Sequence, residues 1–67
     1  MKWKADSEYL KPRSYEIRED LPAGFYLYVF ENGRCIDKCL QDTLEIIKEQ
    51  ARDDFGVPMD AWIKIEE

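Results

Sequence analysis

The chain has 67 residues, a formal net charge of −5 and no histidine. A chain this short builds a single core, and its 13% of aromatic residues argue against general disorder. The acidic balance argues against nucleic acid as a partner, because phosphate binding requires clustered lysine and arginine, and the absence of histidine removes the most common general base and metal ligand.

The first third of the sequence contains one clear element. Residues 1–13 show neither a period of two nor a helical period, so we expect a loosely ordered arm there, followed by a single domain over residues 14–67. Residues 14–19 alternate, with Tyr15 and Ile17 on one side, and predict a short half-exposed strand. Proline and glycine in residues 20–24 predict a turn.

A hairpin is the strongest local signal. Asn32-Gly33 separates two β-rich runs and predicts a type I′ turn. Counting outward from this turn places Phe30 opposite Cys35 and Tyr28 opposite Asp37. One sheet face then carries aliphatic and phenylalanine side chains suited to a core, namely Phe25, Leu27, Val29, Ile36 and Leu40. The other carries Tyr26, Tyr28, Phe30, Cys35 and Cys39, with Asp37 among them.

A helix follows the hairpin. Its apolar stripe consists of Leu44, Ile47, Ala51 and Phe55, and Ile46 lies on the opposite side. Asp42 with Glu45 has the form of a capping box, and Gly56 is suited to a left-handed end. Residues 61–65 predict a short last strand, which the helical crossover should make parallel to the strand of residues 35–40.

Together these elements predict an α+β fold in two layers. We expect a three- or four-stranded, mostly antiparallel sheet with one helix packed on one face. The sequence does not determine the strand order.

The sequence contains no arrangement of residues typical of an enzyme or a metal site. Cys35 and Cys39 are four residues apart, which on one strand is ~13 Å and too far for a disulfide. A zinc site would have to be completed across a dimer. No glycine-rich phosphate loop is present, and the longest apolar run is too short to span a bilayer. We therefore expect no catalytic activity, cofactor, metal or membrane contact, and a cytoplasmic location.

The tyrosine-rich face of the hairpin is the main candidate surface. The candidate protein-contact residues are Tyr26, Tyr28, Phe30, Asp37 and Ile46. Three interpretations of this face are open. It forms a contact with another protein or a second copy, it is covered by residues 1–13, or it stacks single-stranded nucleic acid. The acidic charge argues against the last of these.

The helix and its exit also carry a resemblance. Asp42-Thr43-Leu44-Glu45, Ala51, Phe55-Gly56-Val57-Pro58 and Ala61-Trp62 follow a spacing close to T-L-E-x-A-K-x-x-A-x-x-x-F-G-V-x-x-x-x-W. This pattern resembles that of a group of small uncharacterised bacterial proteins. The chain departs from it at Ile46 and Ile47, where a polar residue and an alanine are usual. The resemblance implies a bacterial origin and transfers no functional residue.

These observations favour an interaction protein. We expect a small cytosolic acidic module that binds another protein in an accessory or regulatory role, with a basic region on the partner. The alternative is an inhibitor or immunity-type protein directed against a basic nuclease or toxin.

Overall fold

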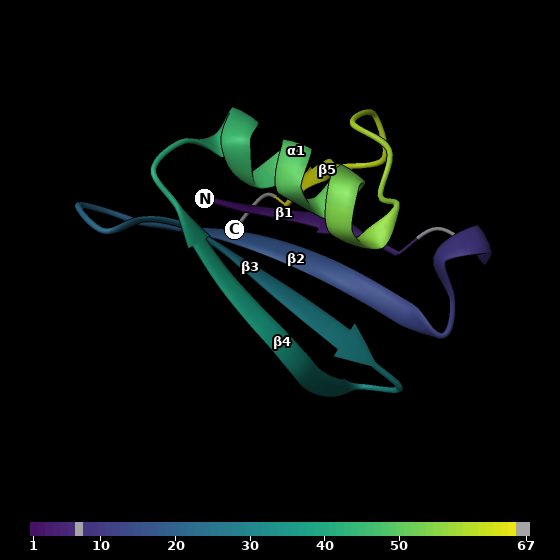
Figure 1. The fold of residues 1–67 in the computed structure, drawn as a ribbon. Helices are drawn as coiled ribbons and strands as arrows, with labels where there is room; N and C mark the ends of the chain where they lie inside the picture. Colours follow the sequence, from purple (N-terminus) through teal and green to yellow (C-terminus); the bar gives the residue numbers. More distant parts are fainter. Residues whose placement is uncertain (7, 66–67) are drawn as a thin grey trace.

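The computed structural model describes residues 1–6 and 8–65 (Figure 1). These residues form five strands, one α-helix and one short 3-10 helix. The strands are β1 (Lys2–Ala5), β2 (Arg13–Asp20), β3 (Gly24–Glu31), β4 (Arg34–Gln41) and β5 (Ile63–Ile65), and the helices are η1 (Glu8–Leu10) and α1 (Leu44–Phe55).

The strands form one antiparallel sheet in the order β4-β3-β2-β1-β5. Helix α1 covers one side of this sheet (Figure 1). We call the covered side the inner face and the opposite side the outer face. The predicted α+β class is confirmed, but the predicted strand number is wrong, because the described residues contain five strands rather than three or four.

The unexpected strand is β1. We expected residues 1–13 to form a loosely ordered arm, but Lys2–Ala5 pair with β2 on one side and with β5 on the other. Four residues are too few to reveal an alternating period in the sequence. Pairing with β2 and β5 holds this segment in the sheet, and the β propensity of its four residues alone would not reveal a strand.

The hairpin turn is formed as predicted, with φ of 53° at Asn32 and 80° at Gly33. The register is as predicted for Phe30 opposite Cys35, but it shifts between Val29 and Phe30, so that Val29 pairs with Asp37. The extra residue on β4 is Ile36. A β-bulge of this kind moves every later residue of the strand to the other face.

This bulge corrects the predicted core. Ile36 and Leu40 were expected beneath the helix but are 43% and 45% exposed. Cys39 is half-buried and packs against the core instead. The buried hydrophobic residues come from β1, β2, β3, α1 and the segment after α1, and they are Ala5, Tyr15, Ile17, Leu27, Val29, Ile47, Ala51 and Val57.

The N-cap of helix α1 is one residue later than predicted. Thr43, rather than Asp42, is the N-cap, and its Oγ1 accepts a hydrogen bond from the backbone N–H of Ile46 at 3.1 Å. The C-terminal end is as predicted. Gly56 has a φ of 75°, and its N–H donates to the carbonyl of Arg52 at 3.0 Å.

Strand β5 is shorter than predicted and begins at Ile63. It runs in the same direction as β4, as the crossover predicted, but it pairs with β1 at the opposite edge of the sheet. Trp62, just before it, packs against the core. The bulge in β4 and the position of β1 together decide which side chains reach the outer face.

Candidate functional site

Three aromatic rings form a row along β3 on the outer face. Tyr26, Tyr28 and Phe30 alternate with Leu27 and Val29, whose side chains point inward and are fully buried. The rings of Tyr26 and Tyr28 are 6.1 Å apart, and those of Tyr28 and Phe30 are 6.4 Å apart and stacked at 25°. All three residues are half-buried. We call these three residues the aromatic row.

Two cations from the neighbouring strands lie over this row. The Arg18 guanidinium of β2 is 4.8 Å from the centroid of the Tyr28 ring. The Lys38 ammonium of β4 is 4.6 Å from the Tyr26 centroid and 5.5 Å from that of Tyr28. Cation–π attraction holds both charges against the rings. Arg18 also donates from Nε to Glu16 at 2.6 Å, whereas Lys38 makes no ion pair with any described residue.

Across the sheet from β4 to β1 the outer face carries cations, and at β5 it ends in two isoleucines. The strand register aligns ten side chains in two rows across the sheet, which are Leu40, Tyr26, Arg18, Lys2 and Ile65, and Lys38, Tyr28, Glu16, Lys4 and Ile63. Four of these residues are cations and one is a carboxylate. These ten residues therefore carry a net positive charge, although the whole chain has a net charge of −5.

Two predicted contact residues lie away from the aromatic row. The bulge places Lys38, not Asp37, opposite Tyr28. The Asp37 carboxylate accepts instead from the backbone N–H of Lys38 at 2.8 Å. Ile46 is 45% exposed but belongs to α1, in the other layer of the fold. Of the five candidates, the structure brings together Tyr26, Tyr28 and Phe30.

Residues 1–6 and 8–13, the described part of the N-terminal segment, do not cover the aromatic row. β1 lies within the sheet rather than across its outer face (Figure 1). Trp3 packs against the core, with its ring 6.1 Å from that of Phe25, and Tyr9 is 66% exposed. The interpretation in which residues 1–13 bury the aromatic row through Trp3 or Tyr9 is therefore corrected.

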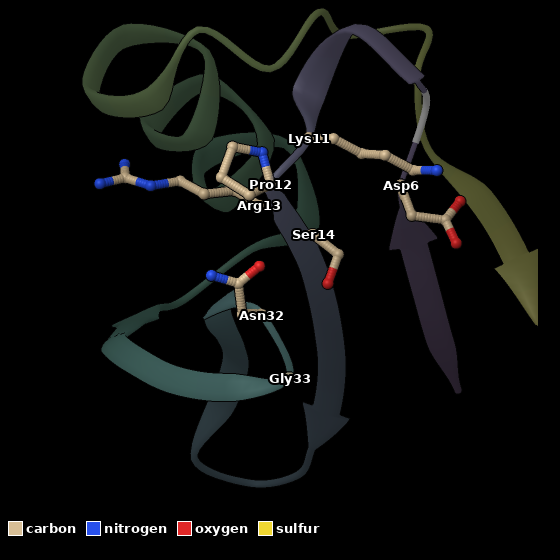
Figure 2. Close-up of a pocket in the computed structure, with 7 residues that line it drawn as sticks. All are labelled: Asp6, Lys11, Pro12, Arg13, Ser14, Asn32 and Gly33. Carbon is tan, nitrogen blue, oxygen red and sulfur yellow. The ribbon is translucent and has the colours of Figure 1, made fainter.

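A hollow of about 590 Å³ lies beside the hairpin turn. Figure 2 shows the residues that line it. Its charged side chains already have partners. Lys11 pairs with Glu8 at 3.0 Å, and Asp6 pairs with Lys4 at 3.2 Å. Arg13 points away from Lys11 and Asp6, and hydrogen bonds to Tyr15 and then Glu31 raise its pKa. The residues that line the hollow are exposed or half-buried, so no desolvated polar group is available to select a ligand.

The two thiols lie on opposite faces of β4. Cys35 is exposed beside Phe30, and Cys39 is half-buried on the inner face. Burial raises the pKa of Cys39, and the charges of Asp37 and Asp54 raise it further. A hydrogen bond with Gln50 lowers the pKa by less, so the net shift is upward. Among residues 1–6 and 8–65, no group of three or more Cys, Asp or Glu side chains is arranged to hold a metal ion.

The sequence missed the cations of this site. Arg18 shares its face with Glu16 in the alternation of residues 14–19, so the pattern contained its orientation. Counting outward from the turn without a bulge pairs Lys38 with Leu27 of the inner face, and no residue in the sequence marks the bulge at Ile36. Lys2 and Lys4 were missed because β1 was not recognised.

Comparison with protein-family models, with curated proteins and with solved structures found no match. The resemblance at the exit of α1 therefore stays a prediction. No described helix is long and apolar enough to cross a membrane.

Proposed function

We propose that this protein is a small accessory module that binds another protein through the outer face of its sheet. The aromatic row carries this proposal. Its three rings are half-buried on a face that α1 leaves open, and Leu40 beside them is 45% exposed (Figure 1). Small proteins seldom expose a contiguous apolar patch unless it makes a contact. Tyrosine suits such a contact, because it combines apolar area with a hydroxyl group.

The occupant that fits best is a protein segment with apolar side chains and hydrogen-bond acceptors. Stacking of nucleic acid bases requires open ring faces. Here the ring of Tyr28 lies between those of Tyr26 and Phe30, and Arg18 and Lys38 lie over it. The rings therefore offer their edges more than their faces, and the two tyrosines add their hydroxyl groups, which favours a protein ligand.

A second copy of this chain fits less well. Two outer faces meeting around a two-fold axis would bring Lys38 and Arg18 of each copy toward another basic surface. Like charges at an interface oppose association. A homodimer through this face is therefore an outcome of the test below and not the proposal.

One observation supports an inhibitor or immunity-type function as a second candidate. Ile46 is 45% exposed on α1, and Glu49 is its acidic neighbour three residues further along the helix. Glu45 and Asp42 add acidic charge at and just before the start of the helix. This surface would suit a basic partner, as a nuclease or toxin often presents. The two candidates use opposite layers of the fold, so one experiment separates them.

The experiment uses Leu40 and Ile46, which are both 45% exposed aliphatic residues. The photo-reactive p-benzoylphenylalanine replaces one or the other in the full chain, and the protein is irradiated in its host cells. We expect a cross-linked protein from position 40 and little or none from position 46. The evidence is the dependence on position, because both variants meet the same mixture of proteins.

Each other outcome has a defined meaning. Cross-links from position 46 but not from position 40 would reject the outer face and support the inhibitor candidate. A cross-link from position 40 to the chain itself would show a homodimer. No cross-link from either position would reject both candidates.

A further inference from the structure

We infer that the partner segment is acidic, with carboxylates that pair with Lys38 and Arg18 on either side of β3. This inference rests on the proposed function and names the chemistry of its ligand. It reverses the expectation drawn from total charge, which was a basic partner.

The positions of the two cations carry the inference. Lys38 belongs to β4 and Arg18 to β2, so the two charges flank the aromatic row. Both charged groups lie within 5.5 Å of the centroid of the same Tyr28 ring. One short segment can therefore contact both charges while an apolar side chain packs against the rings between them.

Lys38 is the stronger of the two contacts. It is exposed and makes no ion pair with any described residue, so a carboxylate would add a partner without displacing one. The rings already restrict its ammonium group, which lowers the conformational entropy lost on binding. The hydroxyl groups of Tyr26 and Tyr28, whose rings lie beneath Lys38, can also donate hydrogen bonds to a carboxylate.

The wider face has the same sign. Lys2 and Lys4 of β1 extend the rows of cations beyond Arg18, and Glu16 is the one carboxylate among the ten aligned residues. Asp6, just after β1, pairs with Lys4 at 3.2 Å and offsets that one charge. Positive charge over this area would speed the encounter with an acidic segment and oppose a basic one. The many carboxylates of the chain lie outside these two rows.

The test is an NMR titration of the ¹⁵N-labelled full chain with three probes. The first is a twelve-residue synthetic peptide with glutamate, leucine and tyrosine in turn, and the second has lysine in place of each glutamate. The third is an oligothymidine of the same length. We expect the acidic peptide to shift amide signals of β2, β3 and β4, with a Kd of about 0.1–1 mM that weakens as salt increases.

Matched lysine variants connect the binding to the proposed contact. Lys38→Ala should weaken the affinity for the acidic peptide by about threefold to tenfold. Lys64→Ala is the control. Lys64 is also an exposed lysine on an edge strand, but it lies opposite Trp3 and therefore on the inner side of the sheet. It should leave the affinity within about twofold.

Several results would overturn the inference. These are equal or tighter binding of the lysine peptide, tighter binding of the oligothymidine, equal effects of the two lysine variants, and no shift from the acidic peptide. Any of them would leave the cross-linking result from position 40 unchanged, so the failure of this inference is distinguishable from failure of the proposed function.

Discussion

The two faces of the sheet are made of alternating residues from the same strands, yet they differ in what completes them. On β3, Leu27 and Val29 are fully buried beneath α1, whereas Tyr26 and Tyr28 are half-buried on the open side. Hydrophobic pattern alone would treat both sides as cores. The difference shows that residue type matters as well, because aliphatic side chains fill a closed layer while tyrosines and cations tolerate water.

The two layers also differ in charge. The outer face carries four cations and one carboxylate in its two aligned rows. Helix α1 carries Glu45, Glu49, Asp53 and Asp54 against Lys48 and Arg52. A net charge of −5 therefore describes neither surface. Expectations about partners must use the charge of the face that makes the contact.

The largest predicted effect contrasts the two sides of β3. Leu27→Ala should lower the free energy of unfolding by about 2–5 kcal/mol, because it removes a fully buried side chain and leaves a cavity. Tyr28→Ser on the outer face should cost about 1 kcal/mol, the loss of a half-buried ring. Urea unfolding followed by circular dichroism measures both. Equal losses would show that the outer face is part of the core.

The second prediction concerns the turns that fix the orientation of β3. Gly24 has a φ of 131°, and a Cβ there would lie 2.4 Å from the carbonyl oxygen of Gln41. Gly24→Ala should therefore cost about 2 kcal/mol or more. Gly33→Val should cost roughly 1 kcal/mol, because its φ is 80° but nothing lies within 4 Å. Thermal melts that rank the two variants in the reverse order would contradict this geometry.

The third prediction tests the start of the helix that closes the inner face. Thr43→Ala should lower the free energy of unfolding by about 1 kcal/mol, because it removes the acceptor for the N–H of Ile46. Asp42→Ala is the control and should have a smaller effect. A larger loss in the free energy of unfolding from Asp42→Ala than from Thr43→Ala would show that Asp42 is the cap, as the sequence indicated.

The smallest effect is chemical, since each face of β4 carries one thiol. The raised pKa of Cys39 leaves less thiolate at a given pH, so iodoacetamide should modify Cys35 first. Increasing the pH toward the raised value should narrow the difference in rate. Mass spectrometry of the native protein over time measures it, and equal rates at neutral pH would contradict the burial of Cys39.

Much of the fold followed from short-range signals. Asn32-Gly33 specified the hairpin, Gly56 ended the helix, and the alternation of residues 14–19 identified β2. Each of these depends on a few adjacent residues. The bulge at Ile36 and the two-sided pairing of β1 depend on contacts between distant segments, which a single sequence does not reveal.

The same limit applies to the candidate site. The aromatic row could be predicted, because its three residues alternate along one strand. The position of Lys38 could not be predicted, because one extra residue on β4 places Lys38 on the outer face and Asp37 on the inner register. The charge of the outer face, and with it the expected partner, therefore depended on the bulge.

The most direct test of the outer face as a binding surface is the cross-link yield from p-benzoylphenylalanine in place of Leu40. The yield is measured in cells for this variant alone and for the same variant that also carries Tyr28→Ser. We expect Tyr28→Ser to lower the yield by about tenfold, because central aromatic residues dominate contact energies. The protein should stay folded, as the helix-side core is intact. A yield that Tyr28→Ser leaves unchanged in the folded protein would contradict the proposed binding surface.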